Sequence, residues 1–253
     1  MSKMRSGNPV LNNSTFDAFR SQSYGASNVM TIQGAATKTL ILLGLCVGTA
    51  SMTWGMVKGQ AVGQAYPWII GGMIGGLVLG FITQFKPTWS PITAPLYAMA
   101  EGLALGGISA AFELRFHGIV FQALTGTFGT TFALLMAYQT GIIKATQNFR
   151  LGLFAATGGI MIMYLVMFVL RISGIYDANL MSMGLWGLAI SAFVVVIAAL
   201  NLVLDFDYIE NAANQGAPKY CEWYGAFGLM VTLVWLYVEI LRLLAIIAGR
   251  SRD

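Results

Sequence analysis

Charged residues are scarce in this 253-residue chain, at 9% of the sequence, whereas soluble domains average about 25%. Hydrophobic residues make up 57% of the chain, and the mean hydropathy is +0.71. So few charged groups cannot cover the surface of a protein of this size in water. The composition therefore excludes an ordinary soluble protein and indicates an integral, multi-pass membrane protein in contact with the lipid bilayer.

Residues that carry common catalytic chemistry are also rare. Histidine occurs once, at His117, and cysteine occurs twice, at Cys46 and Cys221. Metal-dependent hydrolases need clustered histidines or acids, and the two cysteines favour neither a disulfide framework nor a zinc site. No glycine-rich phosphate-binding loop follows a strand, so the sequence contains no ATP-binding motif that could drive transport. We therefore expect no enzyme and no cofactor.

Basic residues are too dispersed to form a nucleic-acid-binding surface. The chain holds 14 Lys and Arg against 10 Asp and Glu, a net charge of +4, without a run of basic residues. Such charges normally set topology, because cytoplasmic loops hold an excess of Lys and Arg. Their distribution favours a cytoplasmic N-terminus. Arg250 and Arg252 argue against an external C-terminus, so the side on which the chain ends stays open.

Seven long apolar runs contrast with these absences. Each has about 20 residues, the number that a helix needs to cross roughly 30 Å of hydrocarbon. The predicted spans are residues 38–57, 67–85, 91–112, 118–141, 151–171, 182–207 and 223–247. The connections are too short to hold a soluble domain. We predict a flexible polar tail over residues 1–35 and an all-α domain of seven transmembrane helices over residues 36–253.

Three carboxylates lie inside these runs or at their ends. Glu101 is about 15 Å from either end of the third span, Asp205 ends the sixth span, and Glu239 lies in the seventh. Placing a carboxylate in hydrocarbon costs about 2.5–3.5 kcal/mol, so such a residue normally faces a polar path or a partner. Each acid therefore has two interpretations, a member of a cation path or a group satisfied by a neighbouring helix.

Helical spacing selects the neighbours of these acids. Asn201 and Asp205 are four residues apart and share a face, whereas Asp207 points elsewhere and suits a solvated position. Asp205 is thus the better candidate for a pore. Glu239 and Arg242 are three residues apart and can pair on one face. A structural ion pair that anchors the last span is the alternative to a functional role for Glu239.

Glycines four residues apart recur in the first three spans, for example Gly44 with Gly48, Gly72 with Gly76, and Gly102 with Gly106. Residues at this spacing share a helix face, and small residues there let two backbones approach closely. We expect these glycines to pack helices together and to carry no chemistry.

Several longer stretches carry a resemblance to a known family. They are residues 96–106 (LYAMAEGLALG), 201–210 (NLVLDFDYIE), 216–220 (GAPKY) and 241–244 (LRLL). With these stretches the chain resembles the Bax inhibitor-1 family of transmembrane Bax inhibitor motif proteins, specifically its bacterial YccA-like branch. The likeness covers most of the membrane region and is most specific at the end of the sixth span and in the last helix.

The resemblance implies a bundle whose last helix is central and wrapped by the other six, in a bacterial inner membrane. It also implies a pH-sensitive calcium leak with two sensor aspartates and a basic latch residue in the second span. Asp205 matches the first aspartate. The second position falls at about Thr232, which does not ionise, and Lys86 stands in the latch region in place of an arginine.

These observations together predict a passive, pH-regulated cation leak with calcium as the permeant ion and Asp205 as the pH sensor. Glu101, Asp205 and Glu239 would offer carboxylate oxygens at successive depths, and calcium prefers several hard oxygen ligands. Asn201 and Thr232 would add neutral oxygens. The alternative is an interaction protein that binds other membrane proteins and modulates a stress response or a membrane protease without conducting ions.

Overall fold

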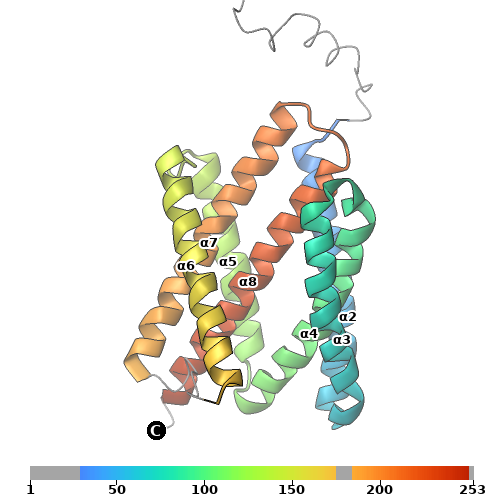
Figure 1. The fold of residues 1–253 in the computed structure, drawn as a ribbon, viewed down its shortest axis with the longest axis vertical. Helices are drawn as coiled ribbons and strands as arrows, with labels where there is room; N and C mark the ends of the chain where they lie inside the picture. Colours follow the sequence, from blue (N-terminus) through green and yellow to red (C-terminus); the bar gives the residue numbers. More distant parts are fainter. Residues whose placement is uncertain (1–28, 175–183, 251–253) are drawn as a thin grey trace, which may run out of the picture.

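The computed structural model describes residues 29–174 and 184–250, which form seven α-helices and one short 3-10 helix (Figure 1). The elements are α2 (Ile32–Lys58), α3 (Val62–Phe85), η2 (Pro87–Trp89), α4 (Ser90–Arg115), α5 (Ile119–Gln139), α6 (Gln147–Ile172), α7 (Gly184–Asn214) and α8 (Cys221–Arg250). The all-α prediction is confirmed. Most of the predicted tail, residues 1–28, lies outside the described residues.

Local sequence signals explain several helix ends. Thr31 caps α2, because its hydroxyl accepts a hydrogen bond of 2.9 Å from the Gly34 N–H, and Thr146 caps α6 in the same way. Gly118 precedes α5 with φ +80°, a left-handed conformation that glycine adopts without steric cost. Pro87 begins the 3-10 helix that turns the chain from α3 into α4.

Six of the described helices are long and apolar enough to cross a bilayer, namely α2, α3, α5, α6, α7 and α8. The remaining helix, α4, contains Glu101, Glu113 and Arg115 and does not meet that description. The described residues thus form seven α-helices, but only six of these have the length and apolar character of a span, so the predicted count of seven transmembrane helices is not confirmed. The chain is a multi-pass membrane protein.

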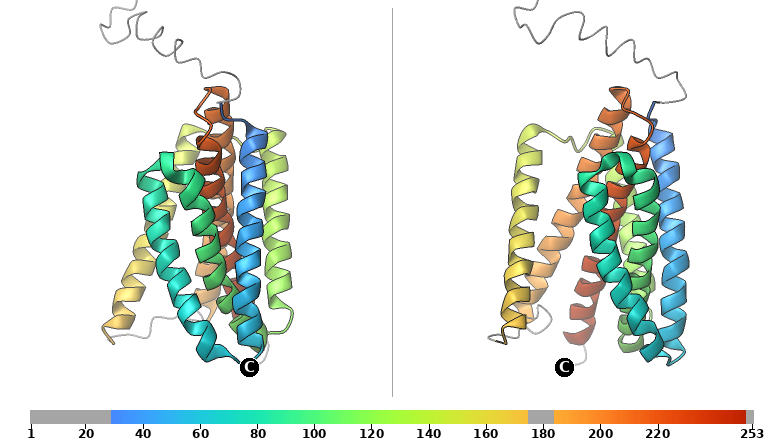
Figure 2. Two further views of the ribbon diagram at one scale, coloured as in Figure 1. Left: turned by 90° about the vertical axis from the view of Figure 1, so that its right-hand side faces the viewer. Right: turned by 45° about the vertical axis from the view of Figure 1, so that its right-hand side comes forward.

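The last helix lies in the middle of the bundle. α8 contacts α2, α4, α5 and α7, while α3 packs on α4 and α6 packs on α7. In Figures 1 and 2, α8 runs between α2, α3 and α4 on one side and α5, α6 and α7 on the other. In the most apolar stretch of each helix, 56% of the residues of α8 are buried, against 11% of those of α6. The predicted central position of the last helix is therefore found, although α3 and α6 form an outer layer.

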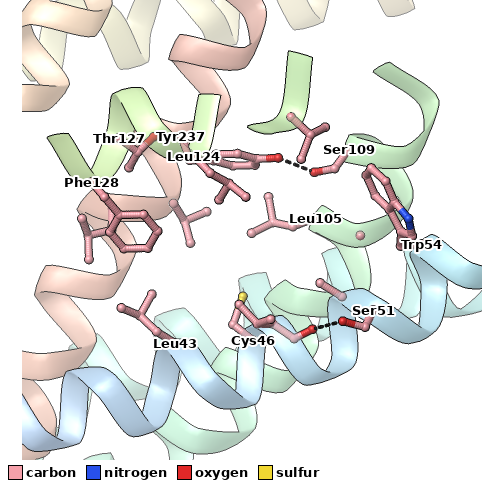
Figure 3. Close-up of a pocket in the computed structure, with 16 residues that line it drawn as sticks. Leu43, Cys46, Ser51, Trp54, Leu105, Ser109, Leu124, Thr127, Phe128 and Tyr237 are labelled. Atoms are coloured by element: carbon pink, nitrogen blue, oxygen red, sulfur yellow. Dashed lines mark hydrogen bonds between the residues drawn. The ribbon is translucent and has the colours of Figure 1, made fainter. Parts of the chain in front are cut away.

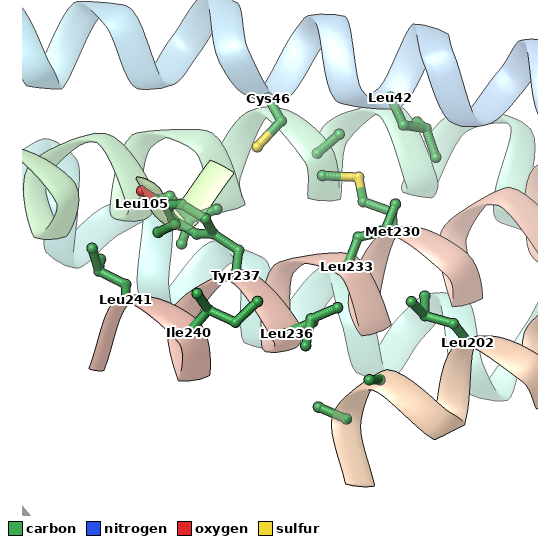
Figure 4. Packing of buried hydrophobic residues seen from close by; sticks show 14 of the residues in the cluster. Leu42, Cys46, Leu105, Leu202, Met230, Leu233, Leu236, Tyr237, Ile240 and Leu241 are labelled. Atoms are coloured by element: carbon green, nitrogen blue, oxygen red, sulfur yellow. The ribbon is translucent and has the colours of Figure 1, made fainter. Parts of the chain in front are cut away.

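The core follows the central helix. Met230, Leu233 and Leu236 of α8 are buried against Leu42 of α2 and Leu202 of α7 (Figure 4). Many large apolar side chains on the outer helices instead project outward, as helices in contact with lipid do. The outer surface of the bundle is thus suited to contact with hydrocarbon, and α8 is the most buried of the six apolar helices.

Glycine packing is strongest between α2 and α4. A Cβ atom added at Gly102 or Gly106 would lie 2.2 or 2.1 Å from a carbonyl oxygen of α2, so only glycine fits at these positions. This pair confirms the packing prediction. Gly44 and Gly48 differ, because added Cβ atoms there would meet nothing within 4 Å. Their four-residue spacing does not mark a helix contact in the described part of the chain.

Candidate functional site

Asp205 lies on α7 and faces the central helix. Its Oδ2 atom is buried and has no hydrogen-bond partner in the described part of the chain. Gly228 of α8 lies beside the carboxylate, since an added Cβ atom would be in van der Waals contact with Asp205 Oδ1 at 3.9 Å. Leu202 and Phe206 on either side of Asp205 are buried in the core. The α7–α8 contact thus holds an acid that its surroundings do not fully satisfy.

Thr232 lies one turn beyond Gly228 on α8 and within interaction distance of the Asp205 carboxylate. Its own hydroxyl donates a hydrogen bond of 3.3 Å to the Gly228 carbonyl. The resemblance placed a second sensor position at about Thr232, and the structure places this residue beside Asp205. One ionisable group and one hydroxyl therefore meet between α7 and α8, in place of two carboxylates.

Glu239 lies on α8 and is satisfied by two partners. Its carboxylate accepts hydrogen bonds from Arg242 Nη1 at 3.1 and 3.0 Å and from Tyr164 Oη at 3.0 and 3.1 Å. Arg242 also donates to Tyr164 Oη, and its guanidinium lies 5.1 Å from the Tyr164 ring centroid. The ion pair indicated by the three-residue spacing is present. Tyr164 of α6 completes it, and nothing in the sequence pointed to that residue.

Glu101 lies on α4 and faces α3. A Cβ atom added at Gly76 of α3 would lie 2.8 Å from Glu101 Oε2, so the glycine makes room for this carboxylate. Gly76 therefore accommodates an acid as well as packing a helix. Glu101 forms no hydrogen bond or ion pair with another of the described residues.

The three predicted path acids occupy three different helix contacts. Asp205 lies between α7 and α8, Glu239 lies between α6 and α8, and Glu101 lies between α3 and α4. Among the described residues, no hydrogen bond or ion pair connects one of these acids with another. None of them lines either of the cavities described below. A continuous path through all three stays a prediction.

The supporting residues have contacts of their own. Asn201 turns to α6, where its Nδ2 donates to Thr157 Oγ1 at 3.0 Å. Asp207 pairs with Arg150 of α6 at 2.5 Å. The ammonium of Lys86 lies 4.5 Å from the Trp89 ring centroid, and the ion pairs of the described residues do not join Lys86 to Asp205.

A cluster that the sequence analysis missed joins the first turns of α2 and α8. Glu222 is fully buried and accepts hydrogen bonds from the backbone N and Oγ1 of Thr31, each at 2.9 Å. It also pairs with Lys38 of α2 and, at 2.8 Å, with Lys219. We call Thr31, Lys38, Lys219 and Glu222 the Glu222 cluster. Lys219, three residues before Glu222, was the only nearby signal in the sequence, since the other partners are more than 180 residues away.

A polar cavity of about 780 Å³ opens at the end of the bundle where α2 begins. Tyr138, Lys144, Asp207 and Glu210 contribute its polar groups, and Phe206 forms part of its apolar wall. Tyr138 Oη donates to Glu210 Oε2 at 2.5 Å. Because Phe206 follows Asp205 in α7, the cavity and the buried acid lie within one turn of each other along that helix.

The described acids do not form a preformed metal centre. No group of three or more His, Cys, Asp or Glu side chains in residues 29–174 and 184–250 is arranged to hold a metal ion.

The chain was compared with known protein families. Residues 8–249 match the model of the family described as Bax inhibitor 1 like. Comparison with curated proteins found no match. The family match includes both Asp205 and Thr232, and it does not separate the branches of the family.

Proposed function

The chain belongs to the Bax inhibitor 1 like family, and on this premise we propose that it is a passive cation leak regulated by pH. Calcium is the proposed permeant ion, and a bacterial inner membrane, with the N-terminus in the cytoplasm, is the proposed location. We also propose that α4 crosses the membrane together with the six apolar helices, because it packs along α2 and α3. The bundle would then contain seven spans.

The observation that carries this proposal is the buried Oδ2 atom of Asp205, which has no hydrogen-bond partner among the described residues. A buried ionised carboxylate without partners is strongly unfavourable, whereas a neutral carboxyl is tolerated. The packed arrangement therefore suits protonated Asp205, and the ionised form favours entry of water between α7 and α8. An ionised, hydrated carboxylate is also the form that attracts calcium. The proposal thus gives a direction, with less flux at low pH.

The other two acids support the proposal to different degrees. Glu239 is fully engaged by Arg242 and Tyr164, so we propose that it anchors α8 to α6 and does not bind the permeant ion. Glu101 has no such partners among the described residues and is available to contribute an oxygen from α4. Entry from the polar cavity would bring a cation past Phe206 before it reaches Asp205.

The test replaces Asp205 with Asn in purified protein reconstituted into liposomes, with calcium flux measured across a range of pH. The Asp205→Asn variant should lose the pH response, because the amide has nearly the same shape and cannot ionise. Glu113→Gln is the control, since Glu113 is an acid on α4 that accepts hydrogen bonds from the backbone N–H groups of Gly118 and Val120 and lines neither cavity. If Asp205→Asn keeps the flux and pH response of the parent protein, Asp205 has no part in the mechanism.

The rival proposal is an interaction protein that binds other membrane proteins. It would be favoured if the purified protein conducts no calcium at any pH, while deletion of residues 1–28 abolishes binding to a partner in cells. Intact partner binding in the deletion variant, together with calcium flux by the parent protein, would reject it.

A further inference from the structure

We propose that a phospholipid binds in the groove between α2 and α5, with one acyl chain inside the groove and its phosphate at Lys58. The groove has a volume of about 420 Å³, and its walls come from α2, α4, α5 and α8. Figure 3 shows Leu43 and Cys46 of α2 facing Leu124 and Phe128 of α5, with Leu105 between them. We call this feature the lipid groove. The inference is independent of the calcium leak.

Small residues on α2 and α4 create the groove. α2 and α5 each pack on α8, and the space between them is bordered by Ala50 and Ser51 on α2 and by Gly106 on α4. Gly106 approaches the α2 backbone so closely that no side chain can fill the floor from that position. The hollow therefore follows from the same glycine that holds α2 and α4 together.

The length and depth of the groove match one leaflet of a bilayer. Its α2 wall runs from Leu43 to Trp54, which corresponds to about 16 Å at 1.5 Å per residue. The hydrocarbon core of a bilayer is roughly 30 Å thick, so the groove covers about half of it. Leu43 lies near the middle of α2 (Ile32–Lys58), and Trp54 lies one turn from its end. An acyl chain extends over the same interval, from the interface to the centre of the bilayer.

The walls suit a hydrocarbon chain because the hydroxyl groups that line them already have partners. The hydroxyls of Ser109 and Tyr237 share a hydrogen bond of 2.7 Å, and Ser51 Oγ donates to the Val47 carbonyl at 2.8 Å. Apolar cavities of this kind hold water poorly and accept apolar ligands. A polar solute would leave its own groups unsatisfied in the groove, whereas a chain of methylene groups would not.

Charge at the mouth of the groove favours a phospholipid over a lipid without phosphate. Lys58 is the last residue of α2, is exposed, and has its ammonium 5.7 Å from the ring centroid of Trp54. It takes part in none of the ion pairs of the described residues. A tryptophan at a helix end is typical of the membrane interface, where phosphate groups lie. The ammonium is therefore available as a counter-charge for a phosphate above a chain in the groove.

The experiment uses the full chain in phosphatidylcholine vesicles that contain a small fraction of phosphatidylcholine with a diazirine in the middle of one acyl chain. After illumination, the labelled residues are mapped by mass spectrometry. Residues of α2 and α5 in the lipid groove should be labelled more strongly than Phe154 of α6, which is 79% exposed and lies outside the groove. Equal labelling of both surfaces would show only bulk lipid and would overturn the proposal.

Val47→Trp fills the groove, and Ser51→Phe is a second filling variant from the same wall. Both should lose the groove label. Leu40→Trp is the matched control, because Leu40 is 70% exposed on the same helix and does not line the groove. It should keep the label. Thermal unfolding of each variant identifies any that fails to fold, and undiminished labelling in both folded filling variants would overturn the proposal.

The phosphate is tested separately at Lys58. Lys58→Ala should lower the groove label several-fold, whereas Lys58→Arg should retain it because it keeps a positive charge at the same place. A diazirine-bearing fatty alcohol, which has no phosphate, should label the groove weakly and equally in all three proteins. If the alcohol labels the groove as strongly as the phospholipid, or if Lys58→Ala has no effect, the assignment of a phospholipid is wrong.

Discussion

Glu222 is fully buried and Asp205 is half-buried, and the two acids have opposite surroundings. Glu222, in the first turn of α8, receives hydrogen bonds or ion pairs from Thr31, Lys38 and Lys219. Asp205, which faces the same helix two turns further along, has an oxygen with no partner among the described residues. Burial alone therefore does not distinguish a structural acid from a functional one. The number of donors around the carboxylate separates these two acids, and the missing donor at Asp205 is the ground on which we propose a functional role for it.

Glu222→Gln should cause the largest loss of stability among the variants. The substitution removes the charge that balances Lys38 and Lys219, and breaking a buried ion pair typically costs about 3–5 kcal/mol. The loss of stability should lie at the lower end of this range, because the side chain of Lys219 is 46% exposed and can turn to water. Unfolding in detergent, followed by circular dichroism, measures the change. A variant as stable as the parent protein would mean that the Glu222 cluster does not hold α2 to α8.

Tyr164→Phe should have the next largest effect. It removes a hydroxyl that donates to Glu239 and accepts from Arg242, and hydrogen bonds to charged groups contribute about 1.5–3 kcal/mol. The same unfolding measurement applies, with calcium flux as a second readout. Because Glu239 is proposed as an anchor, flux by the folded variant should keep its pH response. Loss of that response in a folded variant would return Glu239 to the cation path.

Gly34→Ala tests the Glu222 cluster by crowding it. An added Cβ atom would lie 2.0 Å from Glu222 Oε1, so the carboxylate must move away from Thr31. Overpacking of this kind typically costs about 1–3 kcal/mol. Gly44→Ala on the same helix is the control, since its Cβ would meet nothing within 4 Å. Equal melting temperatures for the two variants would contradict the close contact at Gly34.

Asp205→Asn should change stability least. The amide leaves no buried charge to be satisfied, so the free energy of unfolding should stay within about 1 kcal/mol of the parent value. This small effect is the counterpart of the large one at Glu222. A loss of stability comparable to that of Glu222→Gln would show that Asp205 has a structural role, and the comparison between the two acids would fail.

Contacts within one helix were predictable, and contacts between distant helices were not. The pair Glu239–Arg242 followed from a spacing of three residues, but Tyr164 is 75 residues away from Glu239 and carries no pattern that links it to α8. The position of Thr232 beside Asp205 came from the family resemblance, since spacing alone cannot align two helices. The apolar runs located the seven helices, because each long helix must bury its backbone polar groups within itself in lipid.

Helix ends were predicted less well than helix centres. The first span was expected to begin at residue 38, whereas α2 begins at Ile32, because Thr31 caps a polar first turn that an apolar run does not mark. The sequence analysis missed the Glu222 cluster for the same reason. Its residues are polar and lie at helix ends, where a sequence pattern indicates solvent. Only the packing of α2 against α8 makes Glu222 a buried group.

The close contact at Gly102 and Gly106 has a mechanical consequence. The two backbones touch there without intervening side chains, so we expect α2 and α4 to move together. The contact between α7 and α8 holds ordinary side chains and one acid with an oxygen that lacks a hydrogen-bond partner among the described residues. We therefore expect the bundle to open between α7 and α8, while α2 and α4 keep their relative position.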